Sequence, residues 1–221
     1  MPDNKDSKYR QALEVFGSRA ESANFRLMVA LCRIKLEDYR QALQDYQAVL
    51  VGMLRNRRSW FGMSMPYLLV NAYAMAYLPD LYPQVDAEIE AYKKVPEGDA
   101  PMAHTAYAEM HLLRGESEEA LAHVPAMLKR PKYKDVYAVG LVVQAIANRR
   151  QEDFDAALAQ LLQAHRGQAK FGQLRESPEG YLCLHAMTLV RVAQEYGLTV
   201  TSDSEYLSLP YLAYAASGGR V

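Results

Sequence analysis

Histidine is the residue type in this chain best suited to hold a metal ion, and the spacing of the histidines can be tested first. His104 and His111 are seven residues apart, so one face of one helix could present both. Zinc sites on helices more often use a pair four residues apart with further ligands, and neither His-Glu-x-x-His nor Cys-x-x-Cys occurs. We therefore expect no metal site and interpret the five histidines as amphipathic or packing residues: His104, His111, His123, His165 and His185.

A cysteine and a histidine also lie close in sequence, at Cys183 and His185, and such a pair can serve as nucleophile and base. Residues two apart on a helix point about 200° away from each other, so these two side chains cannot meet directly. The chain also lacks the Gly-x-Ser-x-Gly, Gly-x-Gly-x-x-Gly and Walker motifs that position a nucleophile or cradle a phosphate. We expect no catalytic residue, no cofactor and no enzymatic activity.

The charge balance and the two cysteines restrict the partners and the compartment. Lys+Arg 25 against Asp+Glu 26 gives a formal net charge of -1, which does not favour nucleic acid as a partner. Cys32 and Cys183 each lie in an apolar helical pattern, and we interpret them as buried free thiols in a reducing cytosol. The polar first residues do not resemble a signal peptide, and the longest apolar stretches fall short of the ~20 residues that span a bilayer. We expect a cytoplasmic protein that does not enter a membrane.

Two clusters of basic residues are candidate binding sites. Arg55, Arg57 and Arg58 precede Ser59-Trp60-Phe61, and basic residues beside aromatic rings can bind phosphate and stack on bases. A helix C-terminus with favourable positive charge, followed by an aromatic plug, is the interpretation that we prefer. The second cluster surrounds Pro131, and we interpret it as a solvated loop. It contains Lys129, Arg130, Lys132 and Lys134.

Tyrosine is unusually frequent, with 16 residues against five phenylalanines and one tryptophan. Five tyrosines lie between Tyr67 and Tyr92, interspersed with acidic residues. Tyrosine offers a large contact area and a hydroxyl group at low entropic cost, which suits protein interfaces, although helix packing explains such residues equally well. We predict a partner-binding edge here, formed by Tyr67, Asp80, Tyr82, Asp86, Glu88 and Glu90.

Helical periodicity runs through nearly the whole chain, and no hairpin turn between alternating strands is present. The predicted helices are 7–16, 22–35, 38–56, 65–78, 83–94, 101–113, 117–129, 134–149, 153–165 and 178–196. Ser177-Pro178-Glu179 supplies an N-cap, a proline at the first helical position and an acid at the positive helix end, so the last long helix should begin there. We expect one all-α domain over residues 1–221, with about ten helices and a mobile tail from about residue 211.

A short phrase recurs where helices begin. Tyr9-Arg10-Gln11-Ala12-Leu13 is repeated as Tyr39-Arg40-Gln41-Ala42-Leu43, and looser copies end at Leu121 and Leu158. The phrase is typical of a helix that packs back on its predecessor in stacked helical hairpins. Tetratricopeptide units recur about every 34 residues, whereas the steps between these leucines are 30, 78 and 37 residues. We therefore expect irregular tetratricopeptide-like antiparallel hairpins in one compact domain rather than a regular solenoid.

Several segments together resemble the immunity protein 49 family of bacterial polymorphic toxin systems. The resemblance rests on Trp60-Phe61, Tyr67-Leu68-Leu69-Val70-Asn71-Ala72, Phe154-Asp155-Ala156-Ala157-Leu158 with His165, Ser177-Pro178-Glu179-Gly180, Gly197-Leu198-Thr199-Val200 and Glu205-Tyr206-Leu207. It spans about residues 55–210 and is strongest after residue 150. It implies a cytosolic protein without catalytic residues that binds and neutralises a cognate toxin domain.

Two functions are therefore preferred over a third, a helical enzyme, which would need a deep pocket with convergent polar groups and strongly shifted pKa values. The first is an immunity protein that blocks a toxin domain by protein–protein contact. The alternative is a tetratricopeptide-like scaffold or regulator that binds a peptide or a partner protein in a concave groove. The first predicts a compact domain, whereas the second predicts an elongated shape. The oligomeric state is left open by the sequence.

Overall fold

The computed structural model describes residues 4–56, 65–95, 98 and 100–219. These residues form eleven α-helices and contain no β-strand, which confirms the all-α prediction. The helices are α1 (Asn4–Gly17), α2 (Ala23–Lys35), α3 (Tyr39–Arg55), α4 (Met65–Ala76), α5 (Tyr82–Tyr92), α6 (Pro101–Leu113), α7 (Ser117–Leu128), α8 (Lys134–Ala147), α9 (Gln151–Phe171), α10 (Leu184–Glu195) and α11 (Leu209–Ala216). Two 3₁₀ turns accompany them, η2 (Pro79–Leu81) and η4 (Pro178–Gly180). Most of the first basic and aromatic cluster, from Arg57 to Phe61, lies outside the described residues.

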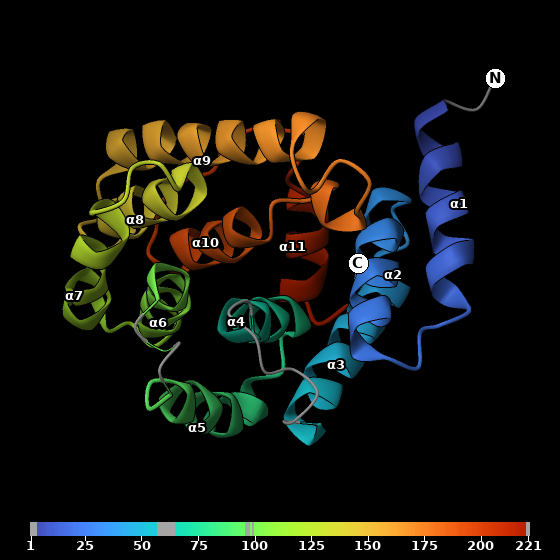
Figure 1. Cartoon of the computed structure of the whole chain (residues 1–221), viewed down its shortest axis with the longest axis horizontal. Helices are drawn as coiled ribbons and strands as arrows, with labels where there is room; N and C mark the ends of the chain where they lie inside the picture. The colour runs from blue at the N-terminus through green and yellow to red at the C-terminus, as the bar shows by residue number, and fades with distance from the viewer. Residues whose placement is uncertain (1–3, 57–64, 96–97, 99, 220–221) are drawn as a thin grey trace.

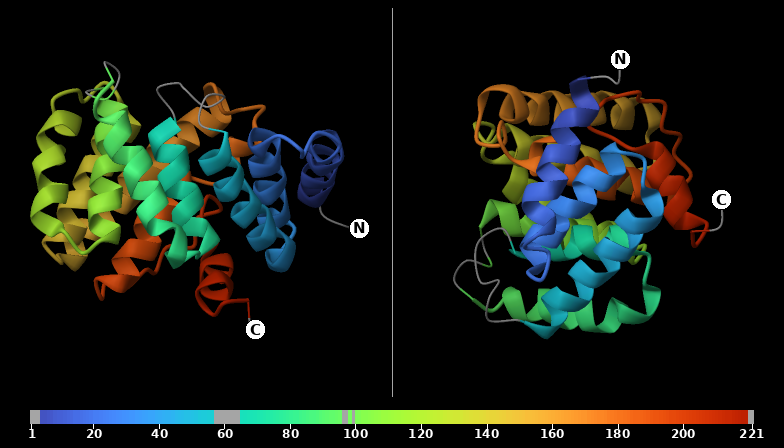
Figure 2. Two further views of the ribbon diagram at one scale, coloured as in Figure 1. Left: turned by 90° about the horizontal axis from the view of Figure 1, so that it is seen from below. Right: turned by 90° about the vertical axis from the view of Figure 1, so that its right-hand side faces the viewer.

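Successive helices pack as antiparallel hairpins, and the hairpins curve around one helix (Figure 1). The row begins with α1 at one edge and reaches α8 and α9 at the other, as the side view shows (Figure 2). Helix α10 lies inside the curve and packs against α4, α6, α8 and α9. Turn η4 contacts both α9 and α2, so the chain after α9 links the two sides of the curve. Much of the inner side of the arrangement is thus occupied by the protein's own C-terminal part.

The turns after five of the helices share a backbone conformation. The residue that follows each of the five helices α2, α4, α6, α8 and α10 by one or two positions has a positive φ. Glycine supplies it at Gly115 (φ 77) and Gly197 (φ 80), because glycine carries no Cβ to clash there. In the turn after α6 the amide of Glu116 donates to the carbonyl oxygen of His111, the bond that closes a helix in a Schellman motif. This geometry lets the next helix reverse direction within a few residues.

The repeated phrase occurs in two structural settings: after a hairpin turn, or within a helix. In the copies at α3 and α7 it follows a positive-φ turn, and Ala42 and Ala120 are fully buried where the new helix meets the old one. In α9 the fully buried residue at the corresponding place, five residues after the turn residue, is Phe154. The first copy lies within α1, where Leu13 is only half-buried. The phrase therefore marks a returning helix only where a hairpin turn precedes it.

Side chains from the last third of the chain bind the carbonyl groups at the ends of the earlier helices. The hydroxyl of Tyr211 donates to the carbonyl oxygen of Met75 at 3.0 Å, and that of Tyr196 donates to Leu112 at 3.2 Å. Both acceptors lie in the last turn of a helix, where carbonyl oxygens lack an intrahelical partner. These bonds hold α4 and α6 against the C-terminal helices.

Two sequence predictions fail in this region. The helix predicted over 178–196 is two elements, because η4 ends at Gly180 and α10 begins only at Leu184. The predicted cap is real, since the hydroxyl of Ser177 accepts from the amide of Glu179 at 3.2 Å, but it starts a single 3₁₀ turn. The backbone is diverted at Cys183, whose amide donates to the carbonyl oxygen of Tyr206 instead of to a helical neighbour.

The second prediction that differs from the structure is the mobile tail from about residue 211. Residues 209–216 form α11, in which Tyr211, Leu212 and Ala215 are buried. Apolar residues at three- and four-residue spacing give this short helix one side that packs on α3 and α4. Within the described residues, no helix combines the length and apolar character needed to cross a membrane.

Candidate partner-binding site

Five of the six residues predicted to bind a partner lie along η2 and α5, the outer helix of the curve. Asp80 and Glu90 are exposed, whereas Tyr82, Asp86 and Glu88 are half-buried. Helix α5 buries Val85, Ile89 and Tyr92. Asp86 and Glu90 are four residues apart and share one face of α5, whereas Glu88 points to a different side. The acidic residues predicted from the sequence therefore lie on one segment, η2 and α5, which we call the α5 strip, but not on a single face.

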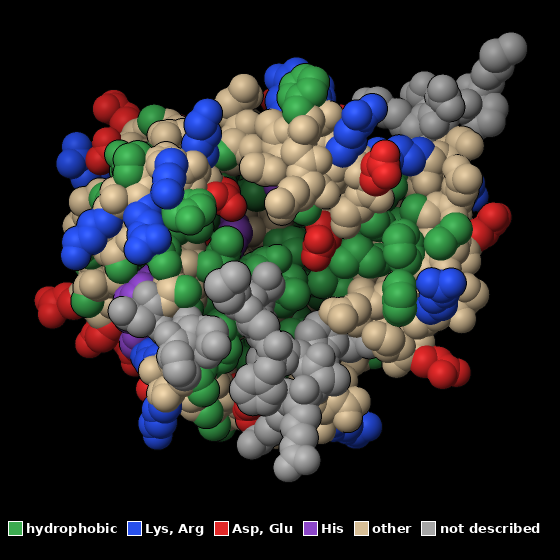
Figure 3. All heavy atoms as spheres, viewed as in Figure 1, with side chains coloured by type: hydrophobic (Ala, Val, Ile, Leu, Met, Phe, Trp, Pro, Cys, Tyr) green, Lys and Arg blue, Asp and Glu red, His purple; other side chains and the backbone are tan. Residues whose placement is uncertain are grey.

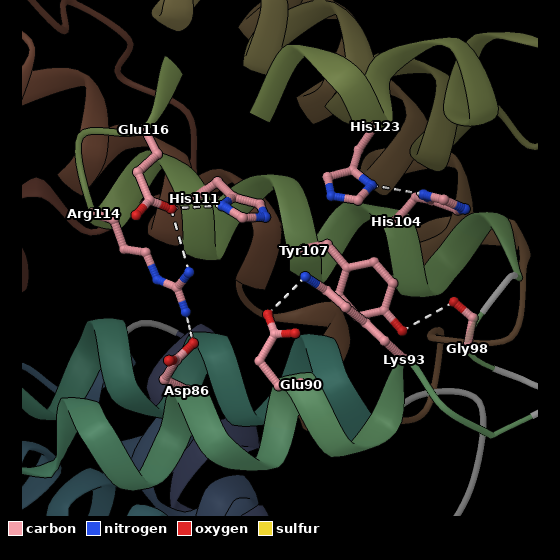
Figure 4. Close-up of polar contacts among 10 residues, drawn as sticks. All are labelled: Asp86, Glu90, Lys93, Gly98, His104, Tyr107, His111, Arg114, Glu116 and His123. Atoms are coloured by element: carbon pink, nitrogen blue, oxygen red, sulfur yellow. Dashed lines mark hydrogen bonds and ion pairs between the residues drawn. The ribbon is translucent and has the colours of Figure 1, made fainter. Parts of the chain in front are cut away.

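Cations from α5 and α6 already neutralise part of this strip (Figure 4). Arg114, at the end of α6, forms an ion pair with Asp86 and lies over the ring of Tyr82, with 5.5 Å from its guanidinium carbon to the ring centroid. Glu90 pairs with Lys93 at 2.7 Å within α5. The Asp86–Arg114 pair connects α5 to the end of α6. Within the described residues, Asp80 is the exposed carboxylate of the strip that forms no ion pair.

Tyr67, the sixth predicted residue, belongs to a different part of the molecule. It lies in the first turns of α4, and its ring packs on the imidazole of His185 with 5.0 Å between centroids. Two other tyrosines of the same stretch, Tyr73 and Tyr92, are buried in the core. Much of the tyrosine enrichment between residues 67 and 92 therefore serves helix packing, which was the alternative interpretation.

Three histidines form a seam between α6 and α7 that the sequence indicates only in part. His104 and His111 lie on one face of α6, as their spacing predicts, and both meet His123 of α7 (Figure 4). The Nδ1 atoms of His104 and His123 are 2.9 Å apart, and burial together with these neighbours lowers the pKa of His123 to about 4. The sequence spacing of His123 relative to the other two histidines does not predict this contact, because the contact depends on how α7 packs back against α6.

The seam continues to the acidic strip through Glu116. Its carboxylate accepts a hydrogen bond from His111 at 2.7 Å, which lowers the pKa of Glu116, and it also contacts Arg114. Asp86, Arg114, Glu116 and His111 thus form one chain of contacts that joins α5, α6 and α7. Among the residues with described positions, no group of three or more His, Cys, Asp or Glu has an arrangement that could hold a metal ion.

A second polar cluster, which the sequence analysis missed, surrounds the start of α10. Glu109 of α6 is fully buried, and its Oε1 lies 2.6 Å from Nδ1 of His185. Burial raises the pKa of Glu109, and the histidine offsets only part of this effect. Burial alone would lower the pKa of His185, but the carboxylates of Glu109 and Asp135 together outweigh it and raise that pKa above its ordinary value. Glu109 could have been noticed as an acid among the apolar residues of an otherwise apolar helix.

The cluster contains no activated nucleophile. Cys183 precedes the first residue of α10 and is buried, and burial raises the pKa of its thiol to about 12. A thiol with so high a pKa stays protonated and unreactive near neutral pH. Cys32 is likewise buried with a pKa raised to about 12, and neither cysteine forms a disulfide.

The fold and these sites define the class of the protein as an all-α protein of irregular antiparallel helical hairpins. Comparison of the chain with protein-family models, curated proteins and solved structures gave no match.

Proposed function

We propose that this protein is an immunity protein, which binds a cognate bacterial toxin domain in the cytoplasm and neutralises it by protein–protein contact. The proposal rests on the sequence resemblance described above, together with the shape of the molecule. The partner surface proposed is the strip on η2 and α5, with Asp80 and Glu90 as its most exposed carboxylates.

The position of α10 is the structural observation that favours this function over a groove-binding scaffold. A tetratricopeptide-like scaffold would bind a peptide on its concave inner face. Here α10 lies on that face, in contact with α4, α6, α8 and α9. A partner would have to displace a helix with eight buried residues to enter, so an outer edge is the more accessible surface.

Asp80 and Glu90, the exposed carboxylates of the α5 strip, are accessible to a partner. Exposed carboxylates rimming an interface steer the encounter with a basic partner and change the association rate when they are replaced. Tyr82 and Asp86, which Arg114 holds in place, give the strip a fixed shape beside these charges. A fixed shape reduces the entropic cost of binding.

The test is binding to the toxin domain that we expect to be encoded directly upstream, in an inactive form. The variant Asp80→Lys/Glu90→Lys should weaken binding at least about tenfold, mainly through slower association, because charge repulsion replaces attraction. The matched control is Glu152→Lys/Asp155→Lys, which reverses two exposed carboxylates on α9. Equal weakening in both variants, or in neither, would place the interface elsewhere. No binding by the wild-type protein would refute the proposed function itself.

A further inference from the structure

Two buried oxygen atoms near the start of α10 have no hydrogen-bond donor. One is Oε2 of Glu109, whose side chain is fully buried, and the other is Oδ1 of Asn71, a residue with 1% of its surface exposed. An unsatisfied buried acceptor destabilises the folded protein, and more so if it is charged. Two of them in one region indicate that a donor belongs there.

Both acceptors lie beside the same turns of α10. Glu109 bonds His185 through Oε1, and Nδ2 of Asn71 donates to Oγ1 of Thr188 and to the carbonyl oxygen of Leu184, each at 3.0 Å. His185 and Thr188 are three residues apart, so they share one side of the helix. The two acceptors thus lie at the interface where α4 and α6 pack on the first turns of α10.

The surroundings carry an excess of negative charge. Burial raises the pKa of the Tyr67 hydroxyl, and the carboxylates of Glu179, Asp135 and Glu109 raise it further, so all three act on one place. No lysine or arginine forms an ion pair with any of these three carboxylates in the described part of the chain. Among the residues that the structure describes, His185 is the one partly compensating group in direct contact with Glu109. A water molecule could supply hydrogen bonds here, but only a cation would also balance the charge.

The region is reachable from one face of the molecule. Figure 3 shows that the surface is hollowed between α10 and α2, with hydrophobic side chains in the hollow and acidic side chains next to it. Tyr67 is half-buried and His185 keeps 13% of its side chain exposed. An aromatic ring beside carboxylates suits an organic cation, which gains from the ring face as well as from the charge.

We propose that this cluster binds a primary ammonium group, whose N–H groups donate to Oε2 of Glu109 and Oδ1 of Asn71. An ammonium group carries three donors and no acceptor, which matches a site that offers acceptors and lacks donors. The site is separate from the α5 strip and does not depend on the proposed toxin binding.

Isothermal titration of the wild-type protein with n-propylammonium tests the proposal directly. A ligand this small binds no tighter than tens of micromolar, so the titration must extend to about 50 mM. We expect saturable binding that tetramethylammonium, which has no N–H donor, does not reproduce. Glu109→Gln should weaken binding at least about tenfold, whereas Glu152→Gln, the loss of an equal exposed charge on α9, should leave it unchanged. Absent saturation, or equal binding of tetramethylammonium, would overturn the proposal.

A measurement on the wild-type protein covers the case in which Glu109→Gln does not fold. The imidazole nitrogen signals of His185 can be followed by NMR as the pH is varied. Bound ammonium balances the Glu109 carboxylate, so n-propylammonium should lower the pKa of His185, and Nα-acetyl-lysinamide should do the same if the natural source is a lysine side chain. If only n-propylammonium has the effect, the source is a small amine. An unchanged His185 titration with both compounds would contradict the site.

Discussion

His165 offers a quantitative test of how the C-terminal segment packs on α9. The residue is 8% exposed, its ring meets that of Tyr206 edge-on at 5.0 Å between centroids, and its Nε2 is buried without a partner. Burial lowers the pKa of His165 from 6.5 to about 4, although a hydrogen bond to the backbone of Gly180 opposes the shift. The side chain is therefore neutral in the folded protein at pH values where it would be charged in the unfolded chain.

The sign and size of the effect follow from this difference. Because the pKa is lower in the folded state, the unfolded state binds more protons between pH 6.5 and pH 4. Stability is thus complete above the ordinary pKa and falls as the pH decreases towards the folded value. Between pH 7 and pH 5 the loss amounts to about 2 kcal/mol from this one residue.

The perturbation is His165→Leu, with His165→Gln as a second variant that keeps a polar group but cannot titrate. The assay is urea unfolding followed by far-UV circular dichroism at pH 7 and pH 5. Other groups titrate alike in the two proteins, so the fall in unfolding free energy should be about 2 kcal/mol smaller in either variant than in the wild type. The same pH dependence in all three proteins would refute the burial of a neutral imidazole at this place.

Three further predictions concern the turns and the core. Phe154→Ala should lower the free energy of unfolding, measured in urea, by about 3–5 kcal/mol, because Phe154 is fully buried. Leu13→Ala should lower it by under about 1 kcal/mol, because Leu13 is only half-buried. Similar losses in the two variants would refute the assigned register of the repeat. Gly115→Ala should lower the free energy of unfolding by about 1–2 kcal/mol, because φ is 77 at this residue. A Cβ at Gly17 would meet no atom within 4 Å, so Gly17→Ala should be neutral or stabilising. Thermal unfolding of the two variants checks this, and equal midpoints would contradict it. Tyr211→Phe should cost about 1 kcal/mol through the lost hydrogen bond to α4 and should speed amide exchange at the end of α4; unchanged exchange would show that this bond does not hold the helix.

The fold could largely be predicted because local rules agree with the global packing over most of the chain. Gly115 and Gly197 end helices where their freedom at positive φ is needed, and the helix predicted over 134–149 is present as α8, Lys134–Ala147. The break between Gly180 and Leu184 was missed because its cause is a backbone bond from Cys183 to Tyr206, far along the chain.

The candidate sites were harder to predict, because each depends on contacts between distant segments. The acidic residues of α5 are adjacent in sequence and could be grouped, yet their pairing with Arg114 needs the return of α6 along α5. Glu109 and His185 are separated by 76 residues and meet only because α10 enters the curve of helices. Helical periodicity assigns each residue to a face but does not say which helix that face meets.

Protection of growing cells tests the proposed function most directly. The toxin domain expected to be encoded upstream is expressed in bacteria with the wild-type protein, with Asp80→Lys/Glu90→Lys, or with the α9 control variant, all at matched soluble levels. We predict that the wild type and the α9 control restore growth and that the α5 variant protects poorly. Cells that stop growing despite soluble wild-type protein would contradict the account.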